Sequence, residues 1–194
     1  MNKIITISRE FGSGGRTIGK KLAEKLGVEC YDSSIISKIA QESGFTVDYV
    51  KEQSEDAQVS GVFGWIAGNY YGDTNSQQLW AVQYDVIREL ASKGPCVIVG
   101  RCADYILHDF ENILKVFIHA DDEKRVARIV EEYGETEIDS HTRLKEKDKK
   151  RKAYYEYITG EEWGKAKNFD ISLDSGTLGI DTCVEIIAEA VNKK

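Results

Sequence analysis

Apolar and polar positions along the chain follow two alternating patterns. Short runs rich in β-branched residues are typical of strands buried in a parallel sheet, and apolar residues at spacings of three and four are typical of amphipathic helices. The runs predict strands over residues 3–8, 28–32, 96–100, 114–120 and 169–173. The helical spacing predicts helices over residues 17–26, 33–43, 77–93, 103–107, 122–133, 139–157 and 179–191.

The order of these elements predicts the fold class. Strands that alternate with helices form parallel sheets covered on both faces, so we expect an α/β fold with three αβα layers around a parallel five-stranded sheet. Residues 1–194 contain no internal repeat and no typical linker, which predicts one domain. Residues 53–75, rich in glycine and aromatic side chains, fit neither pattern. These residues could form a lobe over a bound base, or they could pack on the core or on a second subunit, and the sequence leaves both alternatives open.

Composition narrows the class of protein. The net charge of -7 argues against a general nucleic-acid binder, which usually carries a basic excess. The four cysteines have no metal-ligand spacing, which indicates reduced thiols. The apolar run at the start is too short for a signal peptide, and no stretch reaches the roughly 18 apolar residues of a membrane span. We therefore expect a cytoplasmic protein without a membrane segment. The sequence leaves its oligomeric state open, and a homodimer is one possibility.

The connection between the first strand and the first helix carries very little side chain. It contains the run Gly12-Ser13-Gly14-Gly15, followed by Arg16 and Thr17. The first N–H groups of a helix lack intrahelical partners, and glycines let such a backbone wrap closely around a phosphate. Aligned with the P-loop pattern G-x-x-x-x-G-K-[ST], Gly15 is the second glycine, Arg16 takes the lysine position and Thr17 supplies the hydroxyl for Mg²⁺. The structural alternative is a tight turn whose glycines only allow packing.

Two residues of this loop depart from the P-loop pattern. Glu10 replaces the first glycine, and its carboxylate would repel phosphate unless it points away or helps to hold a metal. Arg16 keeps the charge of the lysine but presents a planar fork instead of an ammonium group. Even so, we expect residues 12–17 to bind nucleotide phosphates.

Other predicted elements carry charged groups suited to phosphoryl transfer. Arg101 directly follows a buried strand, so its side chain is expected at the sheet edge where α/β folds bind ligands. Arg125 and Arg128 are three residues apart on a predicted helix and share a face, as do Asp148 and Arg151. Each group has a structural alternative, which is an ion pair with a nearby carboxylate for Arg101 and a solvated helix face for the others.

The glycine-rich loop and five further stretches resemble one known family. The stretches are YDSSIISK, VIVGRCAD, LKVFIHADDEKRVARIV, KDKKRKAYY and FDISLDSGTLGID. Over nearly the whole chain they resemble the cytidylate kinase-like group of P-loop nucleoside monophosphate kinases. Gly100 and Arg101 match that family's strand end, whereas Cys102 stands where the family has an aspartate.

The resemblance implies a fold of the P-loop NTPase type, with a helical acceptor-binding region at about residues 33–93 and lid helices at about residues 125–157. It also implies ATP and Mg²⁺ as cofactors and small nucleotides as partners. The cations implied in catalysis are Arg16, Arg101, Arg125 and Arg128. The groups implied at the acceptor are Asp32, Ser33, Lys38, Arg101, Asp148 and Arg151. For Asp32 and Ser33 a helix N-cap is an alternative, and for Lys38 a plain surface position.

Three functions are therefore compatible with the sequence. The first is transfer of the γ-phosphoryl group of ATP to a nucleoside monophosphate, with CMP or dCMP as the expected acceptor. The second is a P-loop kinase of another small metabolite, motivated by Cys102. The third is a nucleotide-binding regulatory module without catalysis, motivated by Glu10 and Arg16.

Overall fold

The structure, a computed structural model, describes residues 3–52, 74–133 and 137–193. Five parallel strands form one sheet in the order β2-β3-β1-β4-β5. The strands are β1 (Ile4–Arg9), β2 (Glu29–Tyr31), β3 (Cys96–Val99), β4 (Ile113–His119) and β5 (Ile171–Asp174). All five were predicted to within two residues, which confirms the parallel α/β architecture.

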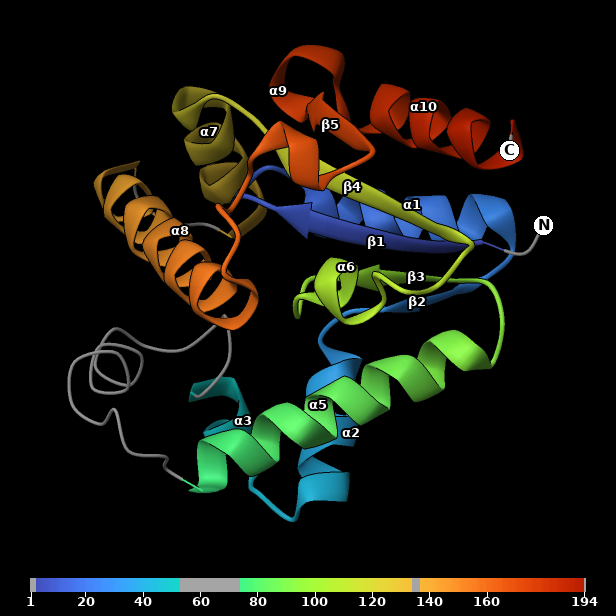
Figure 1. The fold of residues 1–194 in the computed structure, drawn as a ribbon. Helices are drawn as coiled ribbons and strands as arrows, with labels where there is room; N and C mark the ends of the chain where they lie inside the picture. Colours follow the sequence, from blue (N-terminus) through green and yellow to red (C-terminus); the bar gives the residue numbers. More distant parts are fainter. Residues whose placement is uncertain (1–2, 53–73, 134–136, 194) are drawn as a thin grey trace.

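Helices cover both faces of the sheet (Figure 1). One face packs on α1 (Gly15–Leu26) and α10 (Ile180–Asn192), and the other on α2 (Ser34–Ser43), α5 (Thr74–Ser92) and α6 (Ala103–Ile106). Helices α7 (Asp122–Tyr133) and α8 (Glu137–Thr159) pack on each other beside the sheet. The short elements are α3 (Val47–Glu52), the 3₁₀-helix η1 (Ala166–Asn168) and α9 (Ser175–Leu178).

The strands are apolar on both sides because both faces are covered. Along β1, Ile4 packs with α2, α5 and α6, whereas Ile5 and Ile7 pack with α1 and α10. In β3, Ile98 and Val99 point to opposite layers in the same way. This continuous apolar pattern is what a parallel sheet between two helical layers requires.

The structure differs from the predicted elements in three places. The last predicted helix, 179–191, is preceded by the separate turn α9, and the chain breaks between α9 and α10 at Gly179 (φ 80°, ψ 161°). Helix α3 and η1 were not predicted. The unassigned segment 53–75 lies outside the described residues except for its last two positions, where α5 begins.

None of the helices in the described ranges combines the length and apolar character that crossing a membrane requires.

Candidate active site

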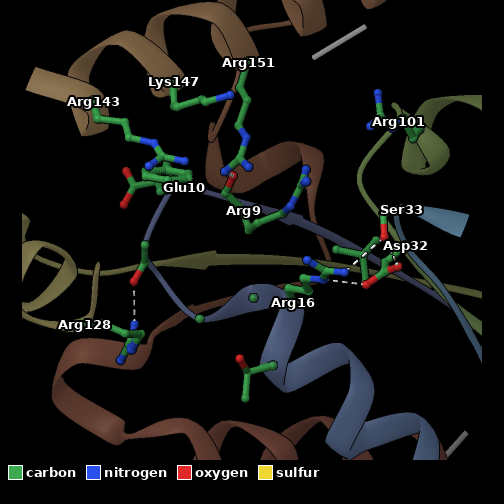
Figure 2. A pocket seen from close by; sticks show the side chains of 16 residues that line it. Arg9, Glu10, Arg16, Asp32, Ser33, Arg101, Arg128, Arg143, Lys147 and Arg151 are labelled. Atoms are coloured by element: carbon green, nitrogen blue, oxygen red, sulfur yellow. Dashed lines mark hydrogen bonds and ion pairs between the residues drawn. The ribbon is translucent and has the colours of Figure 1, made fainter. Parts of the chain in front are cut away.

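A cavity of about 280 Å³ lies where β1, β2 and β3 end. Its wall contains residues 9–12, 14–17, 32–33, 99 and 101, which follow or end these strands, together with side chains from α7 and α8. The carboxyl edge of a parallel sheet is where α/β folds bind ligands. Figure 2 shows that basic side chains from several elements surround this space.

The glycine loop, residues 10–15, bends so that the start of α1 faces the cavity. Gly12 (φ 74°) and Gly14 (φ 78°) have left-handed backbones, and Gly14 is the N-cap of α1 without a side-chain cap. A Cβ atom at Gly15 would lie 2.6 Å from the Cβ of Arg9, so this position requires glycine. No acidic residue occupies the first turn of α1. The loop thus presents the positive end of a helix to the cavity, with little side chain in front of it.

Ser13 and Glu10 fasten the loop. Both the N–H and the hydroxyl of Ser13 donate to the carbonyl of Glu10, at 3.3 and 2.9 Å, and Ser13 is not among the cavity-lining residues. The Glu10 carboxylate accepts a 3.2 Å hydrogen bond from the N–H of Ala120 and lies 3.6 Å from Nε of Arg125. Burial raises the pKa of Glu10, and the positive charge of Arg125 opposes this rise. The carboxylate is therefore held by α7 and by the residue that follows β4, and Glu10 lines the cavity.

Arg16 lies between the predicted donor site and the predicted acceptor residues. Its Nε donates to Asp32 Oδ2 at 2.6 Å, and its Nη2 donates to Ser33 Oγ at 3.0 Å (Figure 2). Ser33 is the N-cap residue of α2 but makes no side-chain cap hydrogen bond, so its hydroxyl faces Arg16 and Asp32 instead. Partial burial opposes ionisation of Asp32, yet the hydrogen bonds from Arg16 and Ser33 lower its pKa. Thr17 lines the same cavity.

Arg101 lines the cavity and has an unusual backbone conformation. Within the described chain, Arg101 (φ 61°) and Cys102 (φ 53°) are the two residues other than glycine with positive φ. Residues other than glycine rarely adopt this backbone conformation, and its energetic cost must be offset by contacts with the surrounding structure. Arg101 is buried and lines the cavity, whereas Cys102 is buried in an aromatic cluster with Tyr154 and Tyr155.

One face of α8 supplies three more basic side chains. Arg143, Lys147 and Arg151 follow one another at a spacing of four and all line the cavity. The guanidinium carbons of Arg143 and Arg151 lie 5.5 and 5.6 Å from the centre of the Phe11 ring. Figure 2 shows Arg143 and Arg151 extending from α8 toward the glycine loop, with Lys147 between them. Only Arg151 was named as a site residue from the sequence, although the spacing of four within the basic run was a usable signal.

Arg9 is a further cavity residue that sequence reasoning missed. It is the last residue of β1, and its carbonyl accepts a 3.2 Å hydrogen bond from Arg151. A single arginine that ends a buried strand offered no motif to distinguish it.

The predicted pairs on α7 and α8 separate into two locations. Arg128 lines the cavity and donates to the Gly12 carbonyl at 2.7 Å. Arg125 and Asp148 form an ion pair beside the loop and are not among the cavity-lining residues. Asp148 also accepts a 2.7 Å hydrogen bond from the N–H of Phe11, while Arg125 donates to the Phe11 carbonyl at 3.1 Å. These two residues therefore dock α7 and α8 onto the glycine loop.

Lys38 lies away from the cavity. Its ammonium group is 3.0 Å from the Glu89 carboxylate, which raises the pKa of Lys38. The structure thus does not bring Lys38 together with Asp32 and Ser33.

The electrostatics of the cavity are opposite to those of the whole chain. Although the net charge is -7, seven basic side chains line the cavity against the two carboxylates of Glu10 and Asp32. The basic residues are Arg9, Arg16, Arg101, Arg128, Arg143, Lys147 and Arg151. Such a concentration of cations at a helix N-terminus favours ligands that carry several negative charges.

Comparison with known sequences identifies the family. A sequence model described as the cytidylate kinase-like family matches residues 4–177, so the chain belongs to that family. Cytidylate kinase of Archaeoglobus fulgidus is 29% identical, over 98% of this chain and 95% of that protein. Cytidylate kinase of Methanopyrus kandleri is 23% identical, over 97% and 93%.

Comparison with solved structures agrees with the fold. An uncharacterized protein from Eubacterium ventriosum superposes with a TM-score of 0.77 at 29% identity, covering 99% of both chains. Shikimate kinase from Acinetobacter baumannii, solved in complex with shikimate, gives a TM-score of 0.55 at 16% identity, covering 100% of this chain and 95% of that one. At that identity the likeness shows the P-loop kinase fold alone. Family and fold together support a kinase of a nucleotide or another small metabolite.

Proposed function

We propose that this member of the cytidylate kinase-like family transfers the γ-phosphoryl group of ATP to a nucleoside monophosphate, with CMP or dCMP as acceptor. The observation that carries the proposal is the cavity itself, in which seven basic side chains and the open start of α1 converge. Phosphoryl transfer needs two phosphates held in line and their charge neutralised, and it needs little covalent help from the protein.

The donor phosphates would bind to the glycine loop. The backbone of residues 12–16 would wrap the phosphates, and Arg16 and Arg128 would neutralise their charge from opposite sides of the loop. Arg128 already contacts the Gly12 carbonyl, and its guanidinium lies 3.2 Å from the place of a Gly14 Cβ atom.

The residues also fit a magnesium ion bound together with phosphate. Magnesium keeps several waters and takes few protein ligands beside phosphate oxygens. The described residues contain no cluster of three or more His, Cys, Asp or Glu side chains that could hold a metal by themselves, whereas the Thr17 hydroxyl lines the cavity at the first turn of α1. Thr17 would hold the ion, which when bound would neutralise charge on the transferring phosphoryl group.

The acceptor would lie toward β2, β3 and α8. Arg101 and Arg151 would hold its phosphate, and Asp32 and Ser33 would form hydrogen bonds with the rest of the acceptor. Arg16 would then stand between the two substrates, since it contacts Asp32 and Ser33 and lies at the P-loop cation position.

A second candidate is phosphorylation of a metabolite other than a nucleotide. It is favoured by Cys102, which stands where the cytidylate kinase-like family has an aspartate. Cys102 packs among aromatic side chains and does not line the cavity.

A coupled assay of ADP release tests the proposal, with ATP, Mg²⁺ and a panel of nucleoside monophosphates. We expect turnover with CMP or dCMP above the background of ATP hydrolysis. Turnover only with hydroxylated non-nucleotide metabolites would favour the second candidate. ATP binding by calorimetry without phosphate transfer to any acceptor would instead identify a regulatory nucleotide-binding module.

A further inference from the structure

A buried glutamine connects three elements that surround the cavity. Gln83 lies on α5 with 3% of its surface exposed. Its Nε2 donates to the backbone carbonyl of Arg101 at 3.2 Å, and the same atom lies 3.2 Å from the hydroxyl of Tyr154 on α8. One amide therefore joins α5, the turn after β3 and α8.

The contact with Arg101 falls on the strained part of the backbone. Arg101 and Cys102 both have positive φ, and the buried amide donates to the carbonyl between them. A conformation of this kind persists only where neighbouring groups hold it. A carbonyl can only accept, so the side-chain nitrogen of Gln83 must face it.

The contact with Tyr154 reaches the helix that carries the second acceptor cation. Tyr154 is three residues from Arg151 on α8, so both side chains are on the same side of the helix. Tyr154 is itself buried, and its hydroxyl lies 3.5 Å from Gln83 Oε1 in addition to its contact with Nε2.

We propose that Gln83 is a positioning residue that fixes Arg101 relative to Arg151, so that the two guanidinium groups hold one phosphate of the acceptor. This inference rests on the proposed function and assigns Gln83 no contact with a substrate. Because the side-chain amide acts on a backbone carbonyl and on a tyrosine hydroxyl, its loss should change the acceptor site and leave the donor site at the glycine loop intact.

Two substitutions and one matched control test the role. Gln83→Met keeps the length of the side chain and removes both donors, and Tyr154→Phe removes the link to α8 while the bond to Arg101 stays. The control, Tyr155→Phe, removes a neighbouring buried hydroxyl of α8, which donates to Asp104 at 2.7 Å and does not contact Arg101 in the described hydrogen bonds. The readouts are kcat and KM for CMP and for ATP, together with Tm.

We expect Gln83→Met to lower kcat/KM for CMP about tenfold, equivalent to ~1.4 kcal/mol, with KM for ATP within twofold of wild type. Tyr154→Phe should lower kcat/KM for CMP about threefold. If Gln83→Met fails to fold, this decrease alone tests the positioning role. Tyr155→Phe should lower Tm and leave kcat/KM for CMP within twofold. Equal kinetic losses in the control and in Gln83→Met, or equal losses for both substrates, would overturn the positioning role.

A binding titration with inorganic phosphate separates this inference from the proposed function. If wild type turns over no monophosphate, the proposed function fails, yet the difference in phosphate affinity between variants still reports on the two arginines, because the glycine loop is the same in all of them. Weaker phosphate binding in Gln83→Met than in Tyr155→Phe, approaching the affinity of Arg101→Met, would then support the role of Gln83. Equal affinity in the two variants, or no phosphate binding by wild type, would overturn it.

Discussion

The ion pair between Arg125 and Asp148 is expected to stabilise the docking of α7 and α8 on the glycine loop. The two side chains are 6% and 17% exposed. Removing one partner from a fully buried pair costs about 3–5 kcal/mol. Arg125 keeps Asp122 at 2.5 Å, and Asp148 is not fully buried, so we expect Asp148→Asn to lower the free energy of unfolding by about 2 kcal/mol.

A double-mutant cycle measures the pair itself. We expect Asp148→Asn and Arg125→Met to be non-additive by about 1–2 kcal/mol, because each removes the partner of the other. Urea denaturation at neutral pH, followed by circular dichroism, gives the four free energies of unfolding. The same cycle on the more exposed pair of Lys38 and Glu89 is the control and should show a smaller coupling, of about 0.5 kcal/mol or less. Additive effects of Arg125 and Asp148, to within about 0.3 kcal/mol, would refute this account of the loop.

Three further predictions follow from single residues. Gly14→Ala should cost about 1–2 kcal/mol of stability and weaken ATP binding, because the backbone there is left-handed and the new Cβ would overlap Cδ1 of Ile180. Gly160→Ala has a similar φ and free space, so it should cost stability alone; urea denaturation and calorimetry of ATP binding measure the two effects. Asp32→Asn should tighten ATP binding about threefold by releasing Arg16, equivalent to ~0.6 kcal/mol, and unchanged or weaker binding would contradict this. Burial raises the pKa of Asp104 to about 6, so the folded state binds this proton more tightly than the unfolded state does. As pH rises from about 4 to about 6, wild type should therefore lose about 2 kcal/mol of stability relative to Asp104→Asn. Parallel profiles of stability against pH for the two proteins would argue against this.

Much of the fold follows from local sequence patterns. The buried strands were found because β-branched runs such as residues 96–99 are flanked by turns, and the glycine loop was found because its motif lies within eight residues. Helix α9 was missed because its four residues form a single turn between β5 and the predicted start of the last helix at residue 179.

The site was less predictable, since most of its contacts connect distant parts of the chain. Lys38 resembled an acceptor residue, but its partner Glu89 is 51 positions away and faces it from α5. Arg143 and Lys147 belong to a charged run of a kind that is usually solvated, and only the position of α8 relative to the loop turns them toward the cavity. Gln83 carries no sequence signal, because one glutamine in a helix is common and its role depends on a strained carbonyl 18 residues away.

The proposed function depends on the N–H groups at the start of α1 as the ligands of a triphosphate. Amide chemical shifts of isotopically labelled protein, titrated with ATP and Mg²⁺, test this directly. We predict that the largest shift changes fall on Gly14, Gly15, Arg16 and Thr17, whose backbone begins the helix at the cavity. Saturating ATP that leaves these four amides unchanged would contradict the account.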